Sequence, residues 1–348
     1  IVKLVLLKML YFNSTNGLKH IICIAGLALA LASCEKIEKV EAPVFSVTTE
    51  KDTYAAGESV KFFFHGNPDI ISCYTGELGN NYDYTDGRIA EPDFLITFDQ
   101  QHIDGQQLDQ FHVLVSKNFD EDYSYEGITA SNVEWIDISD RFNLLGPYKD
   151  ADKQVIGTNA YTNVGTANIT DLLDGDRTKL YFAVRYTAEP WSNGHDTHIT
   201  RVKNFVLSSR YETLNTELTT WGGFGWQMTT KFEQQAPPRN SEIQEANKVI
   251  QFRVGWGNKP GGGTYQSDGA DNWAITQAVW LDRVLDMGPD RAIGIKGVND
   301  VKKESFEYEF EYPGTYEVVF RAQNANIDGS KETICKLRIH ITDPEAGE

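Results

Sequence analysis

The sequence predicts an all-β protein, because apolar and polar residues alternate near both ends of the chain and no helical periodicity is sustained between them. Near the start, single polar or aromatic residues separate Val60, Phe62 and Phe64. Near the end, the ranges 306–312 and 335–342 show the same alternation. A period of two puts every second side chain on one face of a strand, which is typical of half-buried strands.

The region between these ends is predicted to contain further strands. Its strand-like apolar runs cover 94–98, 111–116, 180–187, 202–208, 249–256 and 273–281. Pro313 and Gly314 mark a turn before the last alternating segments. Only the range 240–247 is expected to form a short helix.

The length and composition indicate a globular protein of about two domains. The chain has 348 residues, of which 41% are hydrophobic and 24% are charged, and a domain commonly takes roughly 100 to 200 residues. It carries 32 basic and 50 acidic residues, a formal net charge of −18. This charge repels phosphate backbones and argues against nucleic acid as a partner.

Residues 1–33 have the layout of a secretory signal peptide. Lys19 and His20 precede an apolar run at 21–32, and small residues follow this run. The run is too short to span a bilayer, which takes about 20 apolar residues. We therefore expect cleavage and export.

The segment Leu31-Ala32-Ser33-Cys34 resembles a bacterial lipobox, in which the chain is cut before a cysteine whose thiol then carries diacylglycerol. This resemblance predicts lipidation of Cys34, and the alternative is plain secretion with an incidental cysteine. Residues 34–42 would form a lipidated tether, and its acidic residues resemble the surface-export signal of Bacteroidetes lipoproteins. The expected location is the outer membrane, with a lipid anchor and the protein facing the extracellular side.

The order of the segments resembles a domain cut in two. Residues 45–74 resemble the opening strands of a PKD-type immunoglobulin-like domain, and residues 313–320 resemble its closing strands. A domain of this kind needs only about 100 residues, far fewer than separate the two segments. We therefore expect a split immunoglobulin-like sandwich over 43–76 and 298–344, with a second domain inserted at 77–297.

The insert resembles a jelly-roll β-sandwich, in which 180–186 and 200–206 are similar to paired strands. The whole layout resembles a family of Bacteroidetes surface lipoproteins of unknown function. The residues that carry this match lie at 66–77, 82–88 and 314–316. The resemblance implies a similarity to the surface glycan-binding proteins of polysaccharide-uptake systems, and it brings no catalytic residue.

Two cysteines lie beyond the tether, Cys73 and Cys335. If both halves of the split domain complete one sandwich, these thiols are candidates for a disulfide in an oxidising compartment. The alternative is two separate thiols that pack as small apolar side chains. Spacing alone does not decide between them, because a disulfide depends on geometry.

Four tryptophans lie among glycines and polar residues, where an aromatic ring has access to a ligand. They are Trp191, Trp221, Trp226 and Trp256. Glycan-binding modules stack exposed rings on the apolar face of a sugar, so these four are the candidate ligand-binding residues. The alternative is that the rings pack beneath long loops. The remaining three, Trp135, Trp273 and Trp280, stand in strand patterns and are expected in the core.

The sequence contains no Gly-x-Ser-x-Gly, His-Glu-x-x-His or Walker motif, so we expect neither an enzyme nor catalytic residues. His195 and His198 are spaced to share a metal ion, but a third ligand is missing and a solvated loop is the simpler interpretation. A structural calcium ion is an alternative at 120–122 or at Asp268 with Asp271, where solvated acids are again simpler. No other cofactor is expected.

These observations predict a cell-surface lipoprotein that binds extracellular glycan for a nutrient-uptake system without catalysing a reaction. The expected partners are a polysaccharide or oligosaccharide, the outer-membrane lipid and an uptake porin. The alternative is a surface adhesion or scaffold subunit that binds protein partners. A hydrolase would instead need two facing carboxylates with separated pKa values in a cleft.

Overall fold

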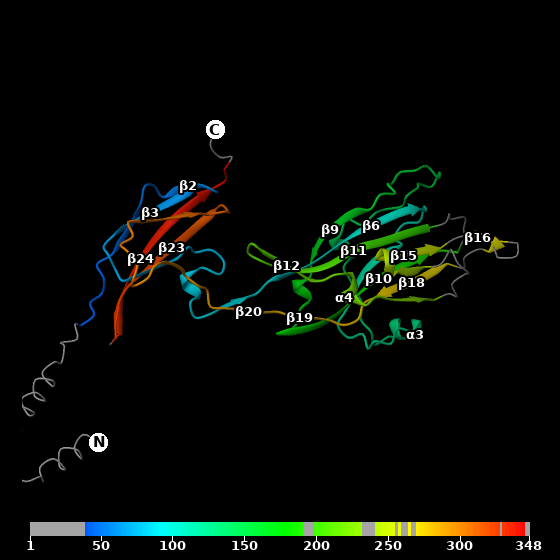
Figure 1. Cartoon of the computed structure of the whole chain (residues 1–348). Coiled ribbons are helices and arrows are strands. Elements are labelled where there is room, and N and C mark those ends of the chain that lie inside the picture. The colour runs from blue at the N-terminus through cyan, green and yellow to red at the C-terminus, as the bar shows by residue number, and fades with distance from the viewer. Residues whose placement is uncertain are drawn as a thin grey trace, which may run out of the picture. The chain divides into compact units, whose positions relative to one another are not determined.

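The structure is a computed structural model that describes residues 39–190, 198–231, 241–254, 257–258, 264–265, 269–327 and 329–344. It confirms the all-β class, because strands supply nearly all of the regular structure in these residues. The chain divides into two compact units (Figure 1). The first contains the chain up to Thr85 and from Asp290 onward, and the second is Asp86–Pro289.

The first unit contains a three-stranded and a five-stranded sheet. The smaller sheet has the order β1-β3-β22, with bounds Ser46–Thr49, Ser59–His65 and Ser305–Glu309. The larger sheet has the order β2-β24-β23-β4-β21, with bounds Thr53–Ala55, Gly329–Thr342, Gly314–Asn326, Ile70–Tyr74 and Ile293–Lys296. Strands from distant parts of the chain therefore pair, β3 with β22 and β4 with β23.

The two sheets of the first unit share an aromatic core. Val60, Phe62 and Phe64 are the buried positions of β3, as their alternation predicts. The ring of Phe320 on β23 lies 5.1 Å from the ring of Phe62 and 5.5 Å from that of Phe64. Each such burial contributes roughly 1.5–3 kcal/mol relative to an exposed side chain. Packing between the two halves of the chain therefore holds this unit together.

Cys73 and Cys335 are both free, so of the two alternatives the structure has the separate thiols and not the disulfide. Cys73 on β4 and Cys335 on β24 both lie opposite Phe320, one on each side of β23. Adjacent strands are about 4.8 Å apart, so two strand spacings exceed the roughly 4.4–6.8 Å between the Cα atoms of a disulfide. The Cys335 thiol instead donates to the carbonyl oxygen of Phe45 at 3.3 Å.

The second unit contains two six-stranded sheets. The first has the order β13-β18-β10-β7-β8, and β19 also pairs with β10. Its strands are Gln227–Thr230, Ala270–Ile275, Arg177–Ala188, Phe111–Ser116, Ile136–Asp137 and, for β19, Val279–Asp282. The second has the order β14-β15-β11-β6-β9, and β12 also pairs with β11. Its strands are Glu242–Gln244, Val249–Val254, His198–Tyr211, Asp93–Asp104, Thr162–Asn168 and, for β12, Leu214–Thr219.

Two-stranded ribbons and short helices complete the structure. The ribbons pair β16 (Gly257–Asn258) with β17 (Thr264–Tyr265), and β20 (Leu285–Gly288) with β5 (Arg88–Ala90). The helices are α3 (Tyr125–Ile128), α4 (Trp221–Phe224), η1 (Tyr82–Tyr84), η2 (Ser139–Arg141), η3 (Thr170–Leu172) and η5 (Glu245–Asn247). Among the described helices, none has the length and apolar character needed to cross a membrane.

β10 and β11 are not paired with each other, although the resemblance to a jelly roll predicted that they would be. β10 pairs with β7, β18 and β19, whereas β11 pairs with β6, β12 and β15. The two strands contribute to one core from different sheets, and the ring of Phe182 lies 6.3 Å from that of Phe205. Alternation identifies the buried side chains but not the neighbouring strand, which explains the error.

Two further expectations about single elements are wrong. The range 273–281 is not one strand, because β18 ends at Ile275 and β19 begins at Val279. Thr276 occupies the break, where its hydroxyl accepts from the Phe182 N–H at 3.0 Å. The range expected to be helical instead holds the strand β14 followed by the single turn η5, and residue 240 lies outside the described residues.

Candidate functional site

The main core of the second unit becomes polar at one end of the sandwich. On β6, the buried positions change from Phe98 to Gln100 and then His102. On β11, the buried Thr200 lies opposite His102, and Val202 lies opposite Gln100. The alternation thus continues along both strands while the inward side chains change from hydrocarbon to amide, imidazole and hydroxyl.

Gln110, which directly precedes β7, completes this polar end from the facing sheet. Its side-chain amide donates to the carbonyl oxygen of Thr187 at 3.0 Å and to the hydroxyl of Tyr186 at 3.2 Å. A carbonyl oxygen only accepts, so the first contact fixes which end of the amide carries the N–H groups. The side chain is 4% exposed.

A cavity of about 320 Å³ lies against these polar residues. Its lining from strands and their ends comprises Gln100, His102, Gln110, Phe111, His112 and Thr200. Its lining from two connections comprises Gln107, Leu108, Asp109, Ser139, Asp140, Leu144, Leu145, Gly146 and Pro147. Cavities that bind small ligands commonly measure about 300 to 1,000 Å³, so this one has the necessary size.

His102 lines this cavity and contains a buried, unpaired acceptor. Its Nδ1 lies 2.9 Å from the carbonyl oxygen of Gly146, so Nδ1 donates and Nε2 of the neutral ring is an acceptor. Nε2 is buried and has no hydrogen-bond partner, and the residue is 5% exposed. Burial lowers the pKa of His102, and nearby backbone carbonyls oppose this only in part. The lowered pKa favours the neutral ring, in which Nε2 is an unprotonated acceptor.

Gln110 presents a second unpaired acceptor. Its Oε1 is buried without a hydrogen-bond partner, while its amide nitrogen is used by Thr187 and Tyr186. Leaving a buried polar atom unpaired costs roughly 1–3 kcal/mol. Two such atoms in residues of one cavity wall distinguish this region from an ordinary polar core, because nearly all buried polar groups in proteins are paired.

A second cavity, of about 560 Å³, adjoins the first. The two share the lining residues His102, Leu145, Gly146 and Pro147. The second continues over Tyr148, Ile156, Gly157 and Thr158. Backbone hydrogen bonds from Ile156 and Gly157 to the Tyr148 carbonyl oxygen, at 3.0 and 3.1 Å, hold this wall together. The site therefore consists of a polar inner cavity and a larger, more apolar outer one.

Residues 33–222 match a family described as a domain of unknown function, DUF5017, and this match covers more than half of the chain. The chain belongs to the DUF5017 family. No curated protein and no solved structure matches it. Every residue that lines the two cavities falls inside the matched segment.

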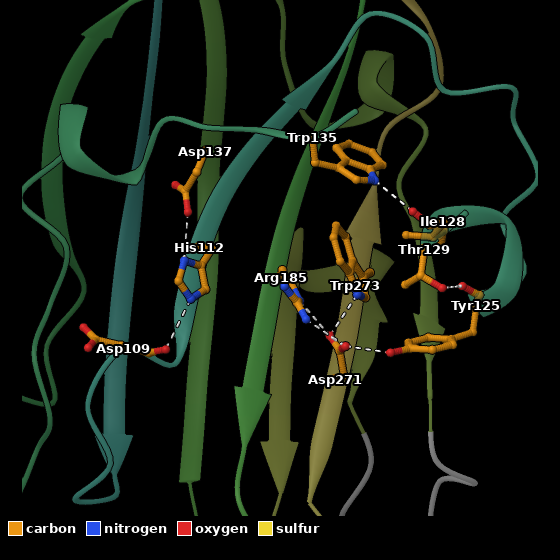
Figure 2. A network of polar contacts seen from close by, with 10 residues as sticks. All are labelled: Asp109, His112, Tyr125, Ile128, Thr129, Trp135, Asp137, Arg185, Asp271 and Trp273. Carbon is orange, nitrogen blue, oxygen red and sulfur yellow. Dashed lines mark hydrogen bonds and ion pairs between the residues drawn. The ribbon is translucent and has the colours of Figure 1, made fainter. Parts of the chain in front are cut away.

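This DUF5017 chain carries a second polar cluster on the opposite, outer face of the sheet that contains β10 and β18 (Figure 2). Asp271 accepts from the Arg185 guanidinium at 2.8 and 2.9 Å, from the Tyr125 hydroxyl at 2.7 Å and from the Trp273 indole N–H at 2.9 Å. The Arg185 guanidinium also lies 4.9 Å from the centre of the Trp273 ring. Protein groups thus complete the hydrogen bonding of this carboxylate.

The charges of this outer cluster stabilise each other. Burial alone would raise the pKa of Asp271, but hydrogen bonds from Arg185 and Tyr125 outweigh it and hold that pKa below its usual value. Burial and the hydrogen bond to Asp271 raise the pKa of Tyr125 to about 12. Tyr125 belongs to the connection that follows β7. This connection packs with Trp273 in a small separate core. The cluster therefore fastens that connection to the sheet.

Trp221 and Trp226 are 8% and 7% exposed and belong to the main core, so the expectation that these two rings are exposed on loops is wrong. The Trp226 ring lies 5.1 Å from that of Phe205, and the Trp221 indole N–H donates to Glu245 at 2.9 Å. The glycines around Trp221 form the short helix α4 and not an open loop. The candidates Trp191 and Trp256 lie outside the described residues.

The three tryptophans expected in the core differ in how far they are exposed. Trp273 is buried and Trp135 is half-buried, and their rings lie 5.4 Å apart. Trp280 on β19 is 53% exposed, so its assignment to the core is wrong. The Arg177 guanidinium lies 5.1 Å from the centre of its ring. On β19, Val279 and Leu281 face the main core, so alternation directs the Trp280 ring between them to the outer face.

The described residues contain no group of three or more His, Cys, Asp or Glu side chains arranged to hold a metal ion. At Asp271, the Arg185 guanidinium contacts both carboxylate oxygens. In the segment 120–122, the two aspartates accept backbone N–H groups of residues 122 and 124. Three other candidates lie outside the described residues, namely Cys34, His195 and Asp268, as does the side chain of His198.

His102 and Gln110 were not among the site residues predicted from the sequence. A signal for His102 was present, because Gln100 and His102 continue the inward phase of the strand that begins at 94–98. A polar residue on the buried phase of a strand needs a partner, and no sequence pattern names that partner. Gln110 carries no comparable signal, since it stands in a connection whose position only the fold determines.

Proposed function

We propose that this chain binds glycan, and that the cavity beside His102 and Gln110 is the binding site. One observation carries the proposal: Nε2 of His102 and Oε1 of Gln110 are both buried, both lack a protein partner and both belong to residues that line the same cavity. A ligand that donates two hydrogen bonds would remove both penalties on binding.

Sugar hydroxyls have the chemistry that these two acceptors require. An apolar ligand would leave both acceptors unpaired, and an anionic oxygen would place acceptor against acceptor. A hydroxyl donates to one of them and keeps its lone pairs for other donors. The apolar faces of a sugar ring also fit Leu144 and Leu145, which line the same cavity.

The cellular setting of the proposal comes from the sequence. We propose a lipoprotein anchored at Cys34 in the outer membrane, which captures extracellular glycan for an uptake porin and catalyses no reaction. The lipobox-like segment at 31–34 and the resemblance to surface lipoproteins support this setting. Labelling of the protein by radioactive palmitate, lost in Cys34→Ala, is the expected result for the anchor.

Affinity gel electrophoresis across plant, host and microbial polysaccharides tests the binding site. The chain from residue 35 onward, which keeps both folded units, is expected to be retarded by a polysaccharide in the panel. His102→Phe removes the acceptor at nearly constant shape and should weaken retardation by about tenfold or more, the loss of one to two hydrogen bonds. His340→Phe makes the same change on β24 of the first unit and should leave retardation unchanged.

Several results would count against the proposal. The proposal fails if no polysaccharide of a broad panel retards the protein, or if His102→Phe and His340→Phe behave alike while both melt as the parent does. Release of reducing ends from the retained polysaccharide would contradict the non-catalytic part. In that case Asp109 and Asp140, the two carboxylates on the cavity wall, are the residues to replace.

The alternative, a surface subunit that binds protein, is favoured by the exposed ring of Trp280 and the guanidinium of Arg177 above it. Tryptophan and arginine dominate the binding energy of many protein interfaces. Trp280 pairs with Lys179 near the start of β10, whereas Gln110 contacts Tyr186 and Thr187 near its end. The two functions therefore use separate surfaces, and Trp280→Ala should leave glycan retardation unchanged while weakening any copurifying partner.

A further inference from the structure

We propose that Arg201 and Lys203 on β11 form a second binding site, which takes an anionic substituent of a glycan, either a carboxylate or a sulfate ester. This proposal rests on the proposed function and adds the class of glycan, which is an acidic one. The second site shares no residue with the lining of the two cavities.

The two cations lie on the face of the sheet that points away from the core. Val202 between them is fully buried, and side chains alternate along a strand, so Arg201 and Lys203 share the outward face. Both approach Tyr161, which directly precedes β9. The Lys203 Nζ lies 3.9 Å from the centre of the Tyr161 ring. A hydrogen bond from Arg201 opposes the rise in the pKa of Tyr161 that burial causes. The two charges therefore converge on one side chain.

Neutral groups hold the guanidinium of Arg201. Its Nε donates to Oε1 of Gln251 at 2.8 Å, and its Nη1 donates to Oε1 of Gln101 at 3.2 Å. Each amide is fixed in turn, because Gln101 donates to the Asn159 carbonyl oxygen at 2.6 Å and Gln251 donates to Glu242 at 3.4 Å. A guanidinium has five N–H donors. These two bonds and the bond to the tyrosine use three, so within the described residues two remain for a ligand.

No carboxylate of the described residues forms an ion pair with Arg201 or Lys203. This is unexpected in a chain with 50 acidic and 32 basic residues. Arginines elsewhere do pair with acids, as in Arg141 with Asp171 at 2.6 Å, Arg210 with Asp93 at 3.2 Å and Arg321 with Glu332 at 2.6 Å. Two cations that neutral groups hold in place, without an acid to compensate them, favour an anionic ligand.

The nearest acid in the sheet is bonded to other groups. Asp99 on β6 lies opposite Lys203, but its two oxygens accept from Asn163 at 3.1 Å and from Asn204 at 2.7 Å. Asn204 directly follows Lys203 at an irregularity of the strand pairing, and its φ is 53°. Irregularities of this kind redirect side chains and are common beside binding sites. Here Asp99 bonds to two asparagines while Lys203 contacts a tyrosine ring.

The first experiment changes the charge of the ligand and keeps its linkage. Calorimetry on the chain from residue 35 onward compares an oligogalacturonate with its methyl ester, and dextran sulfate with dextran. We expect a Kd at least about tenfold lower for the charged member of a pair, the gain from a charge-assisted hydrogen bond. Added salt should reduce this difference. The pair that shows the preference identifies the anionic group.

Equal affinity within both pairs, or no binding in either, would overturn the proposal. The proposed function would still hold if a neutral polysaccharide of the wider panel retards the protein. It fails separately if no polysaccharide of that panel does.

The second experiment removes the two cations together, in a variant that carries Arg201→Gln and Lys203→Met. The Kd for the charged glycan should rise about tenfold or more, to that of its neutral counterpart, and the Kd for the neutral one should not change. The matched control carries Arg210→Gln and Lys179→Met, with the same loss of charge. The Lys179 Nζ lies 5.2 Å from the centre of the Tyr181 ring, so this lysine has a similar setting in the other sheet. Equal losses in both double variants would overturn the site.

Arg201→Lys provides a third measurement that needs no large change in packing. It keeps the charge and loses the planar donor arrangement, so affinity for the charged glycan should fall several-fold. His102→Phe should weaken charged and neutral glycans alike, because its acceptor belongs to the cavity. Unchanged affinity in folded Arg201→Lys, or equal weakening of both glycans by it, would contradict direct contact between this guanidinium and the anionic group.

Discussion

The outer cluster around Asp271 and the inner cavity beside His102 both belong to the second unit, yet their hydrogen bonds are completed in opposite ways. Asp271 receives bonds from Arg185, Tyr125 and Trp273. His102 and Gln110 each keep one buried acceptor without a partner. Polar groups that the protein completes stabilise the fold, and polar groups left incomplete at a cavity indicate a ligand.

Asp271→Asn should give the largest change in stability. The variant keeps the shape but loses the charge that pairs with Arg185, and about 2–3 kcal/mol of unfolding free energy should be lost, the usual worth of hydrogen bonds to a charged group. Urea unfolding of the second unit measures this, followed separately from the first unit because two units need not unfold together. Glycan retardation should persist under native conditions.

The matched control for this change is Asp282→Asn. Asp282 pairs with Arg177 at 3.3 Å, but both side chains are largely exposed, so the variant should unfold as the parent does. Equal destabilisation by the two changes would remove the distinction between a completed cluster and an ordinary surface pair. Loss of glycan binding in folded Asp271→Asn would move the site to the outer face.

His102→Phe should show the reverse behaviour. Retardation by glycan should weaken about tenfold or more, while the unfolding free energy should stay within about 1 kcal/mol of the parent value, because removal of the unpaired Nε2 offsets loss of the bond from Nδ1 to the Gly146 carbonyl oxygen. Parallel urea titrations and gel measurements on one preparation check both quantities. A loss of several kcal/mol with unchanged retardation would make His102 a structural residue.

The same contrast should appear in the dependence on pH. Burial lowers the pKa of His102 below the value of about 6.5 expected in the unfolded chain. Between these two values the unfolded state binds a proton that the folded state excludes, so the unfolding free energy falls as the pH falls below about 6.5, by at most about 1.4 kcal/mol per pH unit. Glycan affinity should fall only at lower pH, below the lowered pKa of folded His102, where Nε2 becomes protonated and no longer accepts.

Subtracting the pH profile of His102→Phe from that of the parent isolates this effect. His112, which lines the same cavity, and all other histidines remain in both proteins, so their titration cancels. The difference in unfolding free energy should be constant above about pH 7 and should change below about 6.5. A difference that is flat down to pH 5 would show that His102 is not held neutral by burial.

The alternation of apolar and polar residues predicted which side chains of a strand are buried, but not which strands are neighbours. The buried positions Val60, Phe62 and Phe64 were predictable, and the strand at 111–116 coincides with β7. Alternation reports the two faces of a strand and not its neighbour, so the pairing of β10 and β11 was wrong. For the same reason Cys73 and Cys335 were placed near each other without the strand between them.

For the tryptophans, too, the neighbouring residues in the sequence did not predict whether the ring is exposed. Glycines around Trp221 and Trp226 suggested open loops, but both rings are buried, and the strand pattern around Trp280 suggested a core although its ring is exposed. Local composition does not determine whether a strand lies at an edge. The inner cavity depends on contacts between β6, β11 and the residue before β7, which are distant in sequence, so only the fold brings them together.

Trp226→Phe should give the smallest change in stability and in glycan binding. It tests whether an unpaired buried atom indicates a ligand only when a cavity lies beside it. Nε1 of Trp226 is also buried without a partner, but Trp226 lines neither described cavity and packs against Phe205 and Phe224. Losing the larger ring costs packing, and losing the unpaired N–H recovers roughly 1–3 kcal/mol, so the net change should stay within about 1 kcal/mol. Urea unfolding should therefore be nearly unchanged, and glycan retardation fully unchanged. Weakened retardation in this variant would mean that an unpaired buried atom indicates a ligand even without a cavity beside it, and the site would then have to extend into the core.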